Sequence, residues 1–93
     1  MTSVSRSSVF AMVHLDRDMT VPVRQQLYAR IRELIVNGNL AADAQLPSTR
    51  TLAAELGVSR NTVVAAFDQL IAEGYLEAKV GAGSFVANRL PDT

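Results

Sequence analysis

The chain has 93 residues, of which 48% are hydrophobic and none is cysteine, so it can form one small domain but not a disulfide-stapled scaffold. No apolar run approaches the roughly 18 to 20 residues of a membrane span, so we expect no membrane partner. Nine basic and nine acidic residues cancel, which counts against a nucleic-acid partner because phosphate neutralisation dominates that affinity.

Residues 1–19 are Ser-rich at first and then briefly apolar, which predicts an N-terminal arm or a short strand. The apolar stretch is broken by His14 and lacks the apolar region of about 7 to 15 residues that an export signal needs. His14 is the only histidine and has no cysteine partners, so we expect it at the surface or in a strand and not on a metal. The predicted protein is soluble and cytoplasmic.

The first predicted helix begins at Pro22, because proline is tolerated in the first turn of a helix and fixes a helical φ. Gly38 follows the end of this helix, as is typical of a helix terminus. Apolar residues recur at helical spacing between them and predict one buried face, formed by Val23, Leu27, Ile31, Leu34 and Ile35.

A connector over residues 40–47 leads to a second predicted helix over residues 49–56. Pro47 disfavours a helical conformation in the residue before it, and Ser48 is a suitable N-cap. Gly57 stops the helix after about two turns, because glycine accepts the left-handed conformation of a sharp turn. The residues expected to be buried are Leu52, Ala53 and Leu56.

A third predicted helix starts after Ser59, a second suitable N-cap, and ends at Gly74. Its apolar stripe consists of Val63, Ala66, Phe67 and Leu70. Two helices joined by a short turn that contains glycine form a helix-turn-helix.

Beyond the third helix the pattern predicts two short strands, 75–80 and 84–87, around the loop 81–83. A loop of this length with glycine indicates a hairpin. We therefore predict a mainly α fold with a small β-hairpin, a winged helix-turn-helix of three helices and a wing. It should span residues 20–88, with the start of an interdomain linker over residues 89–93.

The predicted third helix has a second face that is open to a ligand, formed by Arg60, Asn61, Val64, Ala65 and Asp68. Arg60 and Asn61 lie in its first turn, the part of a recognition helix that reaches base edges in the major groove. Arginine pairs with guanine, asparagine pairs with adenine, and Val64 suits a thymine methyl group. Eight of the nine basic residues are arginine, so the kind of charge favours DNA although the net charge does not.

Other residues are predicted to contact the DNA backbone or the minor groove. The hydroxyls of Ser59 and Thr62 are suitable phosphate anchors at a helix start. Arg50 lies in the first turn of the second helix, where the helix dipole disfavours a cation, so an external anion is indicated. Gly81, in a bare loop near Lys79, suits entry into a minor groove.

Each of these residues also has a purely structural interpretation. Ser59 is first of all a helix cap. Arg50, Arg60 and Asn61, taken singly, are ordinary solvated surface residues. Gly81 is required by a hairpin turn whether or not the turn contacts DNA. It is the combination of these residues in one predicted fold that favours a DNA interface.

In combination, the residues resemble the GntR family of bacterial regulators. The resemblance lies in the order and spacing of five motifs: Leu46-Pro47-Ser48-Thr49-Arg50, Leu52-Ala53, Gly57-Val58-Ser59-Arg60-Asn61-Thr62-Val63, Glu73-Gly74-Tyr75-Leu76 and Gly81-Ala82-Gly83-Ser84-Phe85-Val86. It implies that Arg50 contacts the DNA backbone or bases and that Arg60, Asn61 and Thr62 lie at the major groove. It also implies that Gly81 lies at the wing tip.

The match spans about residues 21–87 and departs from the wider family at two contact positions. Val64 stands where many members have arginine, and Val80 stands where some have histidine, which leaves one base contact and one wing contact open. Asp43 stands where glycine is common, and aspartate tolerates the positive φ of a turn.

More narrowly, the chain resembles the MocR subfamily through three segments: Asp16-Arg17-Asp18, Ser59-Arg60-Asn61-Thr62-Val63-Val64 and Leu90-Pro91-Asp92. The resemblance implies a regulator in which the winged domain precedes a large domain of aminotransferase fold. That domain binds pyridoxal 5′-phosphate, senses the effector and helps to hold a homodimer. These 93 residues do not contain it, so we expect no cofactor in this chain.

Three functions of different classes are consistent with these patterns. The first is sequence-specific binding to the DNA operator of a bacterial promoter. The second is a winged-helix protein interaction module, which the zero net charge and the expected exposure of Val64 and Ala65 favour. The third is an enzyme fragment, but the single lysine, Lys79, lies in a hairpin without a phosphate-binding cup, and no catalytic triad or P-loop occurs. We therefore expect a DNA-binding domain and no enzyme.

Overall fold

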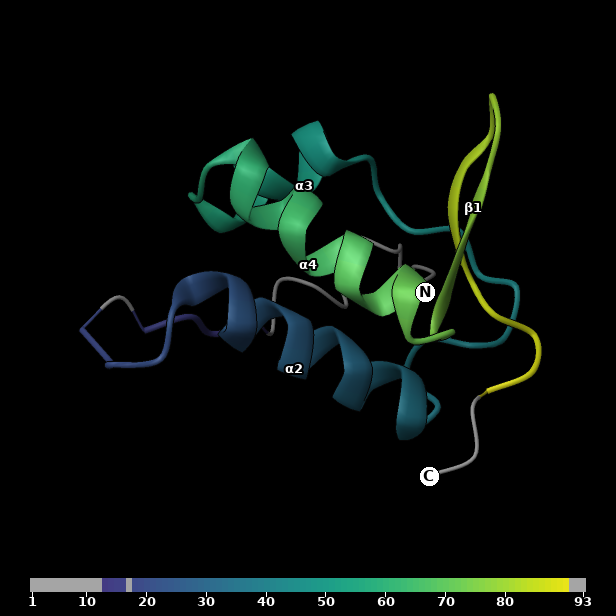
Figure 1. Ribbon diagram of the computed structural model, residues 1–93, viewed down its shortest axis with the longest axis horizontal. Helices are drawn as coiled ribbons and strands as arrows, with labels where there is room; N and C mark the ends of the chain where they lie inside the picture. The colour runs from purple at the N-terminus through teal and green to yellow at the C-terminus, as the bar shows by residue number, and fades with distance from the viewer. Residues whose placement is uncertain (1–12, 17, 91–93) are drawn as a thin grey trace, which may run out of the picture.

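The structure is a computed structural model that describes residues 13–16 and 18–90. Its elements, in chain order, are α2 (Val23–Val36), α3 (Thr49–Leu56), α4 (Arg60–Ala72), β1 (Leu76–Lys79) and β2 (Gly83–Val86) (Figure 1). Helix α4 lies between α2 and α3, and the hairpin stands beside the helices at the end of α4. The predicted mainly α fold with a small β-hairpin is confirmed.

Helix α2 begins directly after Pro22, whose carbonyl accepts hydrogen bonds from the amides of Gln25 and Gln26 at 3.0 and 3.1 Å. The sequence predicted that this proline lies in the first turn, but with an extended ψ of 146° it is the N-cap that precedes the helix. The predicted inner face is confirmed, with full burial at Leu27, Ile31 and Ile35 and partial burial at Val23 and Leu34.

Helices α3 and α4 start with the same serine cap. The Ser48 hydroxyl accepts the backbone N–H of Thr51 at 3.1 Å, and the Ser59 hydroxyl accepts the backbone N–H of Thr62 at 3.2 Å. Between the two helices Gly57 adopts the left-handed conformation at a φ of 69°, where a Cβ would be unfavourable. The two caps and the turn predicted from the sequence are confirmed.

Strands β1 and β2 form an antiparallel hairpin after α4. Leu76 pairs with Val86 and Lys79 pairs with Gly83, which leaves residues 80–82 as the tip. Each strand end differs by one residue from the predicted bounds, which were 75–80 and 84–87.

The connector before α3 also pairs with the hairpin. The backbone N–H of Asp43 donates to the Val86 carbonyl at 2.9 Å, and the Val86 N–H donates to the Ala44 carbonyl at 2.8 Å. Residues 40–47 are thus more than the plain connector predicted from the sequence, because so short a paired segment shows no strand periodicity. Asp43 has a φ of 66°, the positive value expected of a residue that replaces glycine.

The core lies where α4 packs against α2, α3 and β1. Leu56 was predicted to be buried, but it is only partly buried because it is the last residue of α3. No helix in the described part of the chain is long and apolar enough to cross a bilayer. The largest fully buried side chains are Leu27, Ile31, Leu52, Leu70, Leu76, Val63 and Val86.

Of the predicted N-terminal arm, the structure describes residues 13–16, 18 and 19. Val13 and Leu15 are half-buried and pack against the core, His14 is exposed, and this segment is not a strand. The rest of the predicted arm and the end of the predicted linker lie outside the described residues, which omit 1–12, 17 and 91–93.

Candidate nucleic-acid interface

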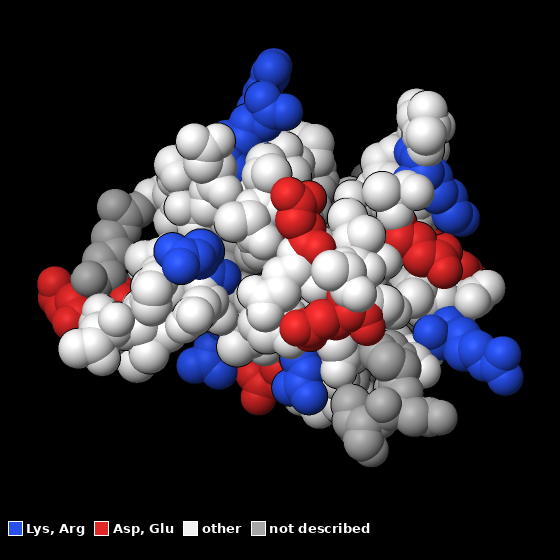
Figure 2. Space-filling view, viewed as in Figure 1, with Lys and Arg blue, Asp and Glu red and all other residues white. Residues whose placement is uncertain are grey.

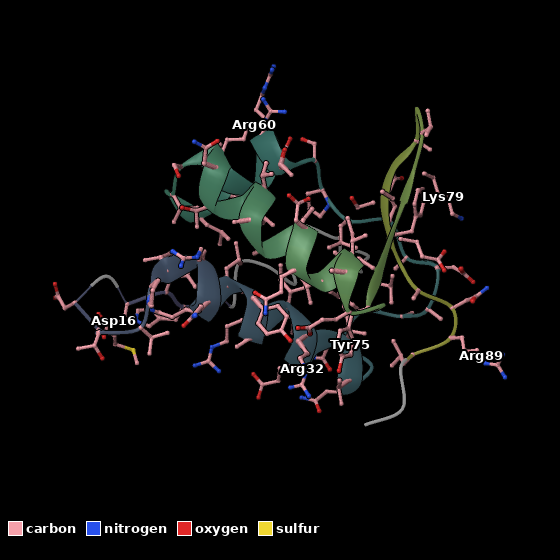
Figure 3. The ribbon with its side chains drawn as sticks, in the orientation of Figure 1. Asp16, Arg32, Arg60, Tyr75, Lys79 and Arg89 are labelled. Carbon is pink, nitrogen blue, oxygen red and sulfur yellow. The ribbon has the colours of Figure 1, made fainter. Side chains whose placement is uncertain are left out.

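The first turn of α4 carries two exposed polar side chains, Arg60 and Asn61. They face away from the core because Val63 and Phe67, on the opposite side of the same helix, are buried. Arg60 projects beyond the helices at the upper end of the molecule (Figure 3). The polar residues predicted to read base edges, Arg60 and Asn61, are thus exposed to solvent. Packing of the opposite side of α4 in the core fixes the orientation of this helix.

Val64 and Ala65 are less accessible than predicted. The sequence placed both on the open face of α4, but both are half-buried in the structure, whereas Asp68 is exposed. A helix packed between two others leaves only a narrow strip of its surface open, and these two residues lie at the edges of that strip. The open face is therefore smaller and more polar than the spacing indicated.

Ser59 and Thr62 make the N-terminal cap of α4. Besides the cap bond, their two hydroxyl oxygens lie 2.9 Å apart in a hydrogen bond. Ser59 is exposed and Thr62 is half-buried. Ser59 is therefore a helix cap, and both hydroxyls lie at the N-terminus of α4, where a phosphate contact was predicted.

Arg50 lies in the first turn of α3 and is exposed. Within the described part of the chain, no hydrogen bond or ion pair restrains its guanidinium group. An arginine near the positive end of a helix dipole gains nothing from that position. Arg50 is therefore accessible, and its contact with an external anion stays a prediction.

The tip of the hairpin is open and partly apolar. Val80 is fully exposed, and a Cβ added to Gly81 would meet no atom within 4 Å. Lys79 does not extend to the tip, because its Nζ lies 4.6 Å from the centroid of the Phe85 ring in a cation–π contact. Gly81 thus occupies the predicted wing tip, whereas Lys79 lies on the side of the wing.

A hollow of about 310 Å³ separates the start of α3 from the hairpin. Its lining includes Thr49, Phe67 and Gly83, and the space-filling view shows it between two projections at the upper end (Figure 2). Gln45 links the connector to the tip of the hairpin, because its Nε2 donates to the Ala82 carbonyl at 2.8 Å. The start of α3 and the wing therefore lie on either side of one concave surface.

Two residues of this surface, Thr49 and Gln45, were not predicted from the sequence. Thr49 accepts a hydrogen bond from the Nε of Arg60 on its Oγ1 at 3.2 Å. Both contacts join segments that are distant in the sequence, so no local pattern signals them. The position of Thr49 beside the cap residue Ser48 was the one available hint, because it placed the side chain at a helix start.

Charged side chains are unevenly distributed on the surface. In the view of Figure 2, basic side chains project at the upper end, whereas acidic and basic side chains are mixed lower on the same face. Among the described residues the one ion pair is Arg30 with Glu33, on α2, at 3.2 Å. The zero net charge therefore does not prevent a locally basic end, where Arg60 projects (Figure 3).

A second polar cluster joins α2 to the end of α4, away from Arg60 (Figure 3). The Tyr28 hydroxyl donates to the carboxylate of Glu73, and the Nε of Arg32 donates to the Tyr75 hydroxyl at 3.1 Å. The hydrogen bond to Glu73, together with partial burial and the charge of Glu73, raises the pKa of Tyr28. The bond to Tyr75 likewise raises the pKa of Arg32. This cluster holds the helices together.

The described residues bring together no three histidine, aspartate or glutamate side chains that could hold a metal ion. Lys79, the single lysine of the chain, lies exposed against Phe85. Such a position has no enclosing phosphate-binding cup and does not fit a Schiff-base lysine for pyridoxal phosphate.

Comparison with known proteins identifies relatives of this chain. The model of the family described as "Bacterial regulatory proteins, gntR family" matches residues 23–86. The chain is 53% identical over 81 residues to the probable rhizopine catabolism regulatory protein MocR of Rhizobium meliloti, covering 87% of the chain and 16% of that protein. It is 48% identical over 61 residues to the pyridoxine biosynthesis transcriptional regulator PdxR of Corynebacterium glutamicum, covering 66% of the chain and 14% of that protein. The resemblance to MocR regulators predicted from the sequence is confirmed.

Solved structures share the fold. YtrA from Sulfolobus acidocaldarius, a GntR-family transcription factor, superposes with a TM-score of 0.80 at 32% identity and covers 85% of this chain and 83% of that chain. AraR(DBD) in complex with operator ORE1 superposes with a TM-score of 0.69 at 30% identity and covers 82% of this chain and 93% of that chain.

Proposed function

The chain belongs to the GntR family of bacterial regulatory proteins, and we propose that it binds operator DNA with α4 in the major groove and the hairpin at the adjacent minor groove. It is the DNA-binding domain of a transcriptional regulator. The observation that carries the proposed placement is the exposed first turn of α4, with Arg60 and Asn61 turned away from the core. A solved domain of this fold, AraR(DBD), is bound to an operator, which supports a DNA partner.

Base recognition is assigned to the first turn of α4. Arg60 has the fork of donors that pairs with the O6 and N7 of guanine, and Asn61 has the donor and acceptor that match adenine. Val64 is half-buried, so it offers at most a small apolar surface to a thymine methyl group. A lost bidentate contact at Arg60 should cost about 1 to 3 kcal/mol and relax the preference at one base pair.

Backbone contacts are assigned to the helix starts and the wing. Ser59 and Thr62 lie at the N-terminus of α4, where hydroxyls and free amides suit a phosphate. No hydrogen bond or ion pair to another described residue restrains Arg50, so it is a point of charge attraction to the DNA backbone. Gly81 at the open tip allows close approach to the minor groove, with Lys79 on the flank of the wing.

The full regulator is proposed to act as a homodimer in the cytoplasm. A single domain of zero net charge gains little from long-range attraction to DNA, so high affinity should require two copies on two half-sites. This chain spans 16% of MocR, which leaves room for a further domain in a regulator of that type. We place dimerisation, effector sensing and any pyridoxal phosphate in such a domain, since Lys79 does not fit the cofactor.

A protein interaction module is the weaker alternative. It was supported by the zero net charge and by the expected exposure of Val64 and Ala65, but both residues are half-buried. The remaining open face of α4 is polar, whereas the centre of a protein interface is apolar and poor in charge. The surface therefore favours DNA.

The proposal is tested by binding of the chain to a duplex from the DNA upstream of its own gene and to a scrambled duplex, each at two salt concentrations. Arg60→Ala is compared with Arg89→Ala, which removes the same charge at a position far from Arg60 (Figure 3). We expect the wild type to prefer the native duplex and Arg60→Ala alone to lose that preference. Equal effects of the two substitutions would contradict the assigned reading face, and an affinity that does not fall with salt would contradict DNA backbone contact.

A further inference from the structure

We propose that Thr49 is a positioning residue for base recognition, which holds the guanidinium group of Arg60 in the orientation that reads a guanine. The inference rests on the proposed function and adds to it a specificity role for α3. Thr49 belongs to α3 and Arg60 to α4, so the base-reading side chain of one helix is oriented by the other.

The contact is a single hydrogen bond with a particular geometry. The Nε of Arg60 donates to the Thr49 Oγ1 at 3.2 Å. The two terminal nitrogens of Arg60 make no hydrogen bond or ion pair within the described part of the chain. Because bidentate recognition of guanine can use these terminal donors, the Nε can be held without competing with the base.

Thr49 is itself well fixed. It is the first residue of α3, it follows the cap residue Ser48, and its side chain is half-buried beside the hollow that separates α3 from the wing. A β-branched side chain is restricted at χ1, which limits the positions that its hydroxyl oxygen can take. Arg60, by contrast, is exposed and would otherwise sample many rotamers.

A neutral hydroxyl group is a suitable partner for positioning Arg60. A hydroxyl oxygen accepts the Nε hydrogen but leaves the positive charge of Arg60 unpaired, whereas a carboxylate would neutralise that charge and repel the DNA phosphates. Ordering a rotamer-rich side chain before binding removes part of the entropy cost of complex formation. Thr49 should therefore improve the reading of one base pair without contacting that base.

The test selects bound duplexes from a randomised pool at low ionic strength with five proteins: the wild type, Thr49→Val, Thr49→Ser, Thr51→Val and Arg60→Ala. Thr49→Val removes the hydroxyl at nearly constant shape, and Thr49→Ser restores it. Thr51→Val is the matched control, because the Thr51 hydroxyl bonds to Ser48 at 2.9 Å and not to Arg60. Thermal unfolding of each variant shows whether it is folded under the selection conditions.

We expect Arg60→Ala to remove the guanine preference at one position of the selected site. Thr49→Val should weaken the preference at that same position by about 3- to 10-fold, the effect of losing one ordered side chain. Thr49→Ser should retain it, and Thr51→Val should match the wild type in base preference. A merely structural role for Thr49 would instead lower affinity at all positions alike.

The outcomes distinguish failure of the positioning role of Thr49 from failure of the proposed function. If Thr49→Val keeps the full guanine preference while Arg60→Ala loses it, the positioning role is overturned and the proposed function stands. If Arg60→Ala keeps the preference, Arg60 is not the reader and the positioning role falls with it. If the folded wild type enriches no sequence, the proposed function itself is contradicted.

Discussion

The side-chain amide of Gln26 pairs with both backbone polar groups of Asp16. Its Oε1 accepts the Asp16 N–H and its Nε2 donates to the Asp16 carbonyl, each at 2.7 Å, and the same Nε2 also donates to the Val21 carbonyl at 2.8 Å. A side chain of α2 thus replaces a strand partner for the arm that precedes the helix. This pairing explains how an irregular segment keeps Val13 and Leu15 on the core.

We predict that Gln26→Ala lowers the free energy of unfolding by about 1 to 2 kcal/mol, because it leaves partly buried backbone groups without partners. Hydrogen exchange of the Asp16 amide should become faster. The matched control is Gln25→Ala, since Gln25 is exposed and its side chain makes no hydrogen bond within the described part of the chain. Unchanged protection of the Asp16 amide in Gln26→Ala would contradict the pairing.

Alkaline pH should weaken the contact between α2 and α4 at Tyr28. The hydrogen bond to Glu73 raises the pKa of the folded Tyr28 above that of an unfolded tyrosine, so the protonated phenol stabilises the fold. This contribution is present at neutral pH and is lost as pH rises from about 10 through the folded pKa. Tyr28→Phe should lower the free energy of unfolding by about 0.5 to 1.5 kcal/mol at neutral pH. It should also reduce the loss of stability at alkaline pH.

The measurement is denaturant unfolding across the alkaline range, with an NMR titration of the Tyr28 ring. Glu73→Gln serves as the comparison, because it keeps an acceptor but removes the negative charge. It should bring the pKa of Tyr28 closer to that of an ordinary tyrosine. A Tyr28 ring that titrates identically in the wild type and in Glu73→Gln would show that Glu73 does not set this pKa.

Substitutions at Asp43 should reveal the cost of its positive φ of 66°. Asp43→Ala should destabilise the domain by about 1 kcal/mol, because alanine lacks the local hydrogen bonding that helps aspartate tolerate this conformation. Asp43→Gly should be neutral or stabilising. The control Ala42→Gly, at an exposed neighbour without a positive φ, should be destabilising. Equal unfolding midpoints for Asp43→Ala and Asp43→Gly in urea would refute this assignment.

The core should be highly sensitive at Leu70, which is 0% exposed in the last turn of α4. Leu70→Ala should lower the free energy of unfolding by about 2 to 5 kcal/mol, a large part of the 5 to 15 kcal/mol that is typical of a domain. Ile71→Ala, on the next, half-buried residue, should cost clearly less. Denaturant unfolding of both variants compares them directly, and similar losses would contradict the burial pattern.

Arg50 should act on affinity and not on sequence preference. Arg50→Ala should weaken binding to native and scrambled duplexes alike and reduce the slope of log affinity against log salt by about 1, the signature of one lost phosphate contact. Binding isotherms at several salt concentrations measure this slope, with Arg89→Ala as the charge-matched control. A change in base preference would instead make Arg50 a base reader.

The local features of the fold were predictable, because each is specified by neighbouring residues. Ser48, Ser59 and Gly57 place two helix starts and one turn, and the sequence predicted all three. The pairing of Asp43 and Ala44 with β2 was not predicted, since it depends on hydrogen bonds across the fold and involves too few residues for a period of two.

The site was predicted in its residues but not in its shape. Arg60 and Asn61 were identified because the buried stripe of α4 determines which side of that helix is open. The partial burial of Val64 depends on how closely the neighbouring elements approach, which one helix cannot reveal. The bond between Thr49 and Arg60 joins two helices that the sequence shows only one after the other.

The most direct test of the central claim is methylation interference on a duplex from the DNA upstream of the gene. Methylation of guanine N7 blocks the major-groove edge, whereas methylation of adenine N3 blocks the minor groove. The account predicts that N7 methylation of a particular guanine prevents wild-type binding and has little effect on Arg60→Ala. Interference only at adenine N3, or an N7 pattern unchanged in Arg60→Ala, would contradict the placement of α4 in the major groove.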